Sequence, residues 1–139
     1  MDQYKKLVDQ ACDARLNSYS PYSHFKVGAA LLASDGRVFV GTNVENASFG
    51  LSNCAERTAI FTAVAAGARD FEAIAVCADG TEPTAPCGAC RQVLVEFGLD
   101  MVVLIAGQDG SGGPVRQTTV RDLVPDAFVS FVDKSGEGS

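Results

Sequence analysis

Two short cysteine motifs constrain this chain more than any other part of its sequence. One is a C-x-E run at residues 54–56, and the other is a P-C-x-x-C run at residues 86–90. Three thiolates can hold a zinc ion and leave the fourth tetrahedral position open, as catalytic zinc requires. The glutamate lies too close to its neighbouring cysteine to bind the same metal easily, but it can move a proton of a metal-bound water. The motifs therefore predict a zinc centre with one acid–base group, Glu56, and three ligands: Cys54, Cys87 and Cys90.

Composition describes an ordinary globular protein. The 139 residues are 47% hydrophobic and 20% charged, which predicts a single domain over residues 1–139 with a frayed polar tail over about 132–139. No apolar run approaches the roughly 18 residues that span a bilayer, so no membrane partner is expected. The net charge of −6 argues against nucleic acid, which proteins bind through clustered Lys and Arg. A small, weakly charged ligand is the better expectation.

The cysteine count bears on the compartment. Five cysteines cannot all pair within one chain, and the N-terminus lacks the apolar core of a secretory signal. We therefore expect a cytoplasmic protein with free or metal-bound thiols. Cys77 lies in the apolar run 73–78 and is expected to be a small buried side chain. Cys12 has no partner at a recognisable spacing, and we assign it no chemistry.

Hydrophobic periodicity and turn residues predict alternating helices and strands. Helices are expected over 2–17, 54–66, 88–97 and about 119–124, and strands over 25–33, 37–41, 71–78, 101–106 and 115–120. Asp35-Gly36 is a strong hairpin signal, and Ser52 or Asn53 is expected to cap the second helix. Short helix–strand links imply right-handed crossovers onto neighbouring parallel strands. The predicted fold is a three-layer α/β/α sandwich around a mixed sheet of about five strands.

This topology would bring the two motifs together. If the intervening strands are parallel, both helix N-termini lie at the same edge of the sheet, where free N–H groups and the helix dipole favour thiolates. Three thiolates leave the zinc complex with a net charge of about −1, which would weaken its ability to acidify water. Arg57 could offset this by donating to ligand sulfurs. The alternative is an arginine on a solvated helix surface.

Two other interpretations of the cysteines stay open at this point. A structural zinc would need a fourth ligand, for which Cys77 and His24 are the candidates. Cys77 lies in a predicted strand, and His24 is the only histidine and is far from both motifs. A C-x-x-C pair alone could also be a redox site, but the upstream C-x-E run and the preceding proline favour catalytic zinc.

Beyond the metal motifs, the chain resembles the small homotetrameric zinc-dependent cytidine deaminases. Zinc deaminases carry an H-x-E or C-x-E motif followed by P-C-x-x-C. Further segments resemble that family in the same order along roughly residues 10–130: 21–25, 27–31, 43–47, 54–59, 86–92 and 123–128. The resemblance implies the fold of that family, one Zn²⁺ per chain and a homotetramer.

The resemblance also implies a reaction and a substrate. It predicts hydrolytic deamination of cytidine and 2′-deoxycytidine to uridine and 2′-deoxyuridine, with release of ammonia, in pyrimidine salvage. Glu56 would take a proton from zinc-bound water, protonate N3 of cytosine as hydroxide attacks C4, and then help ammonia leave. Asn43 and Glu45 would bind the ribose 3′-hydroxyl, and Phe25 would pack against the base. The full set of implied substrate-binding residues is Phe25, Asn43, Glu45, Ala55 and Pro86.

The resemblance to this tetrameric family further implies that three residues act from a neighbouring subunit: Ala47, Phe49 and Phe128. Many relatives carry tyrosine where this chain has Phe49, so we expect altered packing between subunits. On the residues alone, Asn43 and Glu45 could instead only cap a loop, and Phe25 could be a plain core residue.

Other functions also fit the metal motifs. A related deaminase could act on a blasticidin-type antibiotic, a nucleotide or a free base. A nucleic-acid editor would need a basic groove, which the acidic composition disfavours. A zinc-stabilised interaction module would lose nothing on Glu56→Gln substitution.

Overall fold

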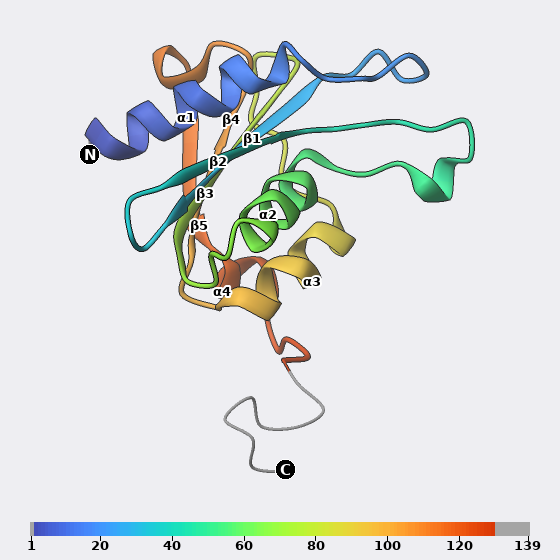
Figure 1. Ribbon diagram of the computed structural model, residues 1–139. Helices are drawn as coiled ribbons and strands as arrows, with labels where there is room; N and C mark the ends of the chain where they lie inside the picture. The colour runs from blue at the N-terminus through green and yellow to red at the C-terminus, as the bar shows by residue number, and fades with distance from the viewer. Residues whose placement is uncertain (1, 130–139) are drawn as a thin grey trace.

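The structure, a computed structural model, describes residues 2–129. Its elements follow the predicted order (Figure 1). They are α1 (Asp2–Arg15), β1 (Val27–Ala33), β2 (Val38–Thr42), the short 3₁₀ helix η1 (Phe49–Leu51), α2 (Ala55–Ala65), β3 (Phe71–Ala78), α3 (Gly88–Phe97), β4 (Val102–Ala106), the 3₁₀ helix η2 (Gly110–Gly112), β5 (Val115–Thr119) and α4 (Val120–Leu123). The tail predicted over about 132–139 lies outside the described residues, and the single domain over 1–139 stays a prediction.

The five strands form one mixed sheet in the order β2-β1-β3-β4-β5. β1 is antiparallel to both β2 and β3, β3 is parallel to β4, and β5 is antiparallel to β4. The expectation that each crossover joins neighbouring strands is right for β3–α3–β4 and wrong for β2–α2–β3. The hairpin around residues 34–36 pairs β2 with β1, so β1 lies between β2 and β3. β2, β3 and β4 nevertheless run in the same direction.

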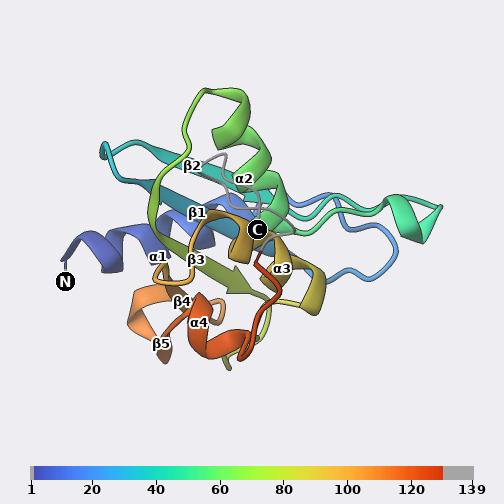
Figure 2. The same ribbon diagram turned by 90° about the horizontal axis from the view of Figure 1, so that it is seen from below.

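Helices cover both faces of the sheet. α1 lies on one face, and α2 and α3 lie side by side on the other (Figures 1 and 2). The strands bury alternate residues toward the two layers, as their period of two requires. On β1, Ala29 and Leu31 join the core cluster under α2 and α3, whereas Ala30 and Leu32 pack with α1. The predicted three-layer sandwich is confirmed.

The start of α2 lies directly against the backbone of β2. A Cβ atom built on Gly41 of β2 would lie 2.6 Å from the carbonyl oxygen of Ala55 and 3.0 Å from Cα of Ala59. Only glycine leaves room for this approach. The contact fixes the first turn of α2, which carries the C-x-E motif, relative to the sheet.

Two long loops leave the sheet on the same side (Figure 1). Residues 16–26 connect α1 to β1, and residues 43–54 connect β2 to α2. Val44 joins them, because it forms a parallel bridge with Tyr19 and an antiparallel bridge with Asn53. The paired loops extend the fold beyond the sheet edge where the cysteine motifs lie.

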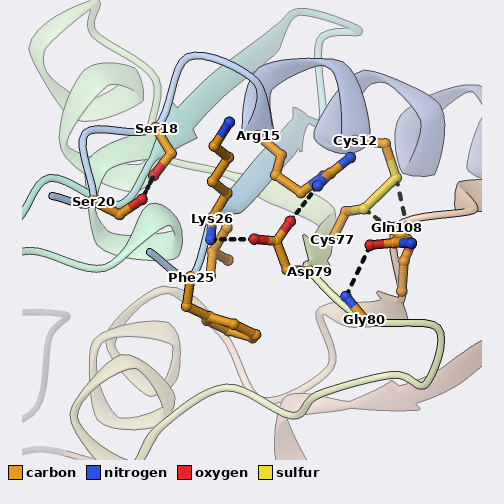
Figure 3. Close-up of polar contacts among 12 residues, drawn as sticks. Cys12, Arg15, Ser18, Ser20, Phe25, Lys26, Cys77, Asp79, Gly80 and Gln108 are labelled. Carbon is orange, nitrogen blue, oxygen red and sulfur yellow. Dashed lines mark hydrogen bonds and ion pairs between the residues drawn. A yellow bond between two sulfur atoms is a disulfide. The ribbon is translucent and has the colours of Figure 1, made fainter. Parts of the chain in front are cut away.

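The prediction of unpaired thiols is wrong for two cysteines. Cys12 of α1 and Cys77 of β3 form a disulfide, with Cα atoms 5.1 Å apart (Figure 3). Cys77 is fully buried, as predicted. The pair was missed because the residues lie 65 positions apart in the sequence and meet only when α1 packs across β3. The odd count of five is thus one disulfide and three free cysteines.

Candidate active site

The three free cysteines lie together at the N-termini of α2 and α3. Cys54 is the N-cap residue of α2, and Cys87 is the N-cap residue of α3, one turn before Cys90. The predicted capping of α2 by Ser52 or Asn53 is therefore wrong. The side chain of Cys54 makes no capping hydrogen bond to the helix and instead faces the other sulfurs.

The geometry of this thiol cluster fits a tetrahedral zinc. With zinc–sulfur bonds of about 2.3 Å, tetrahedral ligands lie about 3.8 Å apart. The Cys54 and Cys87 sulfurs are 3.8 Å apart, those of Cys87 and Cys90 are 3.3 Å apart, and all three lie within 4.8 Å of one another. Within residues 2–129 no fourth Cys, His, Asp or Glu joins the cluster. Cys77 is in its disulfide, so the structural site that would use it as a fourth ligand is excluded.

The surroundings of Cys54 favour its thiolate form. Its pKa falls to about 5, because Cys90 and then Arg57 donate hydrogen bonds to its sulfur, although partial burial opposes the shift. The pKa of Cys90 is raised because its proton is held by Cys54 and because the side chain is buried. Arg57 Nη2 lies 3.3 Å from the Cys54 sulfur, which is the predicted contact with a cluster sulfur. That sulfur in turn raises the pKa of Arg57.

Glu56 lies beside the thiols, close enough to interact with Cys54 and Cys90. It is only 4% exposed, and it lines a cavity of about 390 Å³ that opens between the loops and α2. Burial raises its pKa, and the adjacent Cys54 thiolate adds to the shift. A buried carboxyl with a raised pKa holds a proton more readily than an exposed one and can release it again, as a proton shuttle must.

The cavity brings together most of the residues that the sequence singled out. Of the predicted substrate-binding residues, four line it, and Phe49 does so as well. These four are Phe25, Asn43, Glu45 and Ala55. Pro86 does not line it: it is buried behind the loop, and its carbonyl oxygen accepts a hydrogen bond from Arg91 Nε at 2.8 Å.

Asn43 and Glu45 also hold the two loops together. Asn43 Oδ1 accepts from the backbone N–H of Val27 at 3.0 Å, and its Nδ2 donates to the carbonyl of Phe25 at 2.8 Å. Glu45 accepts from the backbone N–H groups of Tyr22 (3.0 Å) and Ser23 (3.1 Å) and from the Ser23 hydroxyl. The Ser23 side chain, then its backbone N–H, holds the pKa of Glu45 below its ordinary value. Asn43 and Glu45 therefore do bind loop backbone, as the loop-capping interpretation expects, and both residues also line the cavity.

The residues expected to act from a neighbouring subunit lie at or beyond the cavity rim. Phe49 is 75% exposed and packs edge-on against Tyr22, with ring centroids 6.1 Å apart. Ala47 is exposed and does not line the cavity. Phe128 is 57% exposed and lies near α3, where its carbonyl oxygen accepts from Gln92 Nε2 at 2.9 Å. Of these three positions, only Phe49 lines the cavity of its own chain.

Sequence reasoning missed part of the cavity wall. The additional lining residues are Val27, Ser52, Asn53, Val76, Ala78, Thr84 and Ala85. Most are small or apolar residues with no chemical signature. The one available signal was position, since Thr84 and Ala85 directly precede the P-C-x-x-C motif and Val76 and Ala78 end the strand before it.

The fold and the thiol cluster together define a zinc-binding deaminase class, and comparison with known proteins supports this. The family described as the cytidine and deoxycytidylate deaminase zinc-binding region matches residues 1–106. A cytidine deaminase of Halalkalibacterium halodurans is 50% identical over 125 residues, covering 89% of this chain and 92% of the relative. One of Sporosarcina psychrophila is 49% identical over 125 residues, covering 89% and 90%.

Solved structures agree. The crystal structure of cytidine deaminase from Burkholderia pseudomallei matches with a TM-score of 0.84 and 55% identity, covering 88% of this chain and 97% of that one. That of cytidine deaminase from Mycobacterium tuberculosis matches with a TM-score of 0.75 and 38% identity, covering 90% and 96%. This chain therefore belongs to the cytidine deaminase family. Across residues 2–129, no helix has the length and apolar character needed to cross a membrane.

Proposed function

We propose that this chain catalyses the hydrolytic deamination of cytidine and 2′-deoxycytidine to uridine and 2′-deoxyuridine, with release of ammonia, as a step of pyrimidine salvage. The observation that carries the proposal is a buried carboxyl, Glu56, beside three convergent thiols in a cavity of about 390 Å³. This volume is in the range of small-molecule sites. The relatives named as cytidine deaminases support the choice of substrate.

The cysteines and Glu56 would have separate roles in the reaction, metal binding and proton transfer. Zinc held by Cys54, Cys87 and Cys90 would supply a Lewis acid that lowers the pKa of water. Glu56 would accept a proton as water attacks C4 of cytosine, deliver one to N3, and then protonate the leaving amine. A carboxyl suits this role because one group must accept and donate within a single cycle.

The cavity wall would orient the nucleoside. Phe25 would pack against the base, with Ala55 beside it at the start of α2. Asn43 and Glu45 would hydrogen-bond the ribose 3′-hydroxyl. Glu45 keeps its charge because its pKa is lowered by Ser23, so its free lone pairs suit a hydroxyl donor.

Zinc content and ammonia release from cytidine, measured on the wild type, Glu56→Gln and a control, test the proposal. Glu72→Gln is the control because Glu72 is exposed on β3 and lies outside the cavity. We expect one zinc per chain in all three proteins, and turnover in the wild type and Glu72→Gln only. Turnover in Glu56→Gln at the wild-type rate would contradict the proton shuttle. Zinc without turnover of cytidine in the wild type would favour other aminated substrates, such as a nucleoside antibiotic, a nucleotide or a free base, or the interaction module.

The contact of Glu45 with the sugar has its own test. A 3′-phosphate would meet the Glu45 carboxylate and be repelled, so cytidine 3′-monophosphate should be a much poorer substrate than cytidine. Glu45→Gln removes the charge and should narrow the difference between the two substrates. Equal turnover of both substrates by the wild type would refute the 3′-hydroxyl contact.

We further propose a homotetramer in which Ala47, Phe49 and Phe128 complete a neighbour's site. Large exposed apolar side chains support an association surface, among them Phe49 at 75% and Leu51 at 71% exposure. Light scattering should give about four times 14.5 kDa, and a particle of 14.5 kDa would refute the shared site.

A cytoplasmic location is the remaining part of the proposal, and the disulfide bears on it directly, since disulfides persist mainly in oxidising compartments. Alkylation of the protein at the moment of cell lysis, followed by mass spectrometry, would show whether Cys12 and Cys77 are paired in the cell. Paired cysteines there would argue against the cytoplasm.

A further inference from the structure

The last turn of α1 and the end of β3 meet at a shielded ion pair. Arg15 Nη1 contacts Asp79 Oδ1, and the two side chains are only 15% and 28% exposed (Figure 3). The other ion pairs among residues 2–129 lie at the surface, with Arg121 and Asp100 60% and 91% exposed. Arg15 Nε is buried without a hydrogen-bond partner, so Asp79 is the group that offsets the cost of burying the guanidinium.

The second oxygen of the same carboxylate holds the chain beside the cavity. Asp79 Oδ2 accepts from the backbone N–H of Lys26 at 2.8 Å, and the backbone N–H of Asp79 donates to the carbonyl oxygen of Lys26 at 3.0 Å (Figure 3). Both the N–H group and the carbonyl oxygen of Lys26 are therefore hydrogen-bonded to Asp79. Its neighbour Phe25 lines the cavity, and so does Ala78, which precedes Asp79.

Phe25 itself has little other support. Its backbone N–H donates to Ser23 Oγ at 3.0 Å, and its carbonyl oxygen accepts from Asn43 Nδ2 at 2.8 Å. Its side chain is 40% exposed, so core packing does not by itself determine where the ring lies. The hydrogen bonds of Phe25 and Lys26 thus carry much of the positioning of this part of the cavity wall.

We propose that Arg15 and Asp79 are positioning residues, which act through Lys26 to hold the Phe25 ring where it packs against the substrate base. The proposal rests on the proposed function for the identity of the substrate. Arg15 lies on the face of the sheet opposite α2 and α3, so its effect must cross the sheet edge through Asp79. The Cys12–Cys77 disulfide joins the same two elements one turn earlier on α1 and two residues earlier on β3, which keeps Arg15 and Asp79 in register.

This role predicts a specific kinetic pattern. An aromatic wall binds the base alike in the ground state and in the transition state, so its displacement should raise KM and leave kcat nearly unchanged. Judged by the strength of aromatic contacts, KM should rise about three- to tenfold. A loss confined to folding stability would leave KM of the folded, zinc-loaded enzyme unchanged.

The test uses Asp79→Asn, Arg15→Gln and the double variant, with Asp100→Asn as the matched control for an exposed ion pair. kcat and KM for cytidine are measured on zinc-loaded protein well below the melting temperature. Amide hydrogen exchange is measured in parallel for Phe25, Lys26 and Val27. We expect raised KM and faster exchange at Lys26 in both single variants. The KM of the double variant should not exceed that of the more impaired single variant, because the two residues act as one unit.

Unchanged KM together with unchanged Lys26 exchange in Asp79→Asn would overturn the proposal, as would a fall in kcat at constant KM. If the wild type does not turn over cytidine, the proposed function fails, and exchange alone decides the positioning of Phe25. In that case, faster exchange in the variants would support the positioning role, and wild-type exchange would refute it.

Discussion

Arg57 Nη2 donates to the sulfur of Cys54 over 3.3 Å, within the first turn of α2. The donor places a positive charge beside a sulfur whose pKa it helps to lower. It also explains why an arginine follows Glu56 directly: in a helix, the residue three positions after Cys54 lies above it on the same face.

Arg57→Gln should weaken zinc binding without removing a ligand. Loss of a group that supports metal ligands typically costs about 10- to 100-fold in metal affinity, and we expect a loss in that range. Competition with a chromophoric chelator measures it. Arg121→Gln, at an exposed site outside the cavity, is the control. Equal affinities for Arg57→Gln and the wild type would show that the contact is not needed to hold the metal.

Gly41→Ala should displace α2 from the sheet. Its added Cβ would lie 2.6 Å from the Ala55 carbonyl oxygen, which is backbone and cannot rotate away. We expect a loss of about 1–3 kcal/mol in the free energy of unfolding, together with weaker zinc retention, because Cys54 and Glu56 move with the helix. Gly112→Ala, with no atom within 4 Å of its Cβ, is the control. A melting temperature and zinc content like those of Gly112→Ala would refute the close-approach argument.

Cys12→Ser should lower thermal stability and leave zinc content unchanged. Closing a loop between residues 65 positions apart stabilises a protein by about 4 kcal/mol on the chain-entropy account, which corresponds to roughly 15 °C in melting temperature for a chain of this size. Scanning calorimetry with excess zinc measures the change. Reductant should lower the melting temperature of the wild type by a similar amount and that of Cys12→Ser not at all. A wild-type melting temperature that does not change with reductant would contradict a stabilising disulfide.

The contact between Glu45 and Ser23 should persist to acidic pH. Because hydrogen bonds from Ser23 and Tyr22 lower the pKa of Glu45, the contact stabilises the loops above the ordinary value of 4.5 and is lost only as pH falls through the lower folded value. The Ser23 amide chemical shift, followed by NMR, should titrate with a midpoint below 4.5. Glu45→Gln should abolish that transition. A midpoint at or above 4.5 would mean that these hydrogen bonds do not favour the carboxylate.

Much of the architecture could be predicted because it depends on local pattern. The continuous apolar run of β1, the hairpin at Asp35-Gly36 and the alanine-rich stretch of α2 each follow from residues close together in the sequence. The three metal-ligand candidates and Glu56 were also evident, since each motif lies within the first turn of one helix.

What the tertiary structure alone decided is which distant segments meet. The sequence by itself determined the elements, the thiol motifs and the acidic group between them. Only packing decided that β1 lies between β2 and β3, that Cys12 pairs with Cys77, and that Arg15 reaches Asp79. The physical reason is that periodicity and spacing report contacts within a few turns of one element. The contacts of α1 with β3 depend instead on how closely a helix can approach the sheet, which small residues on both surfaces determine together.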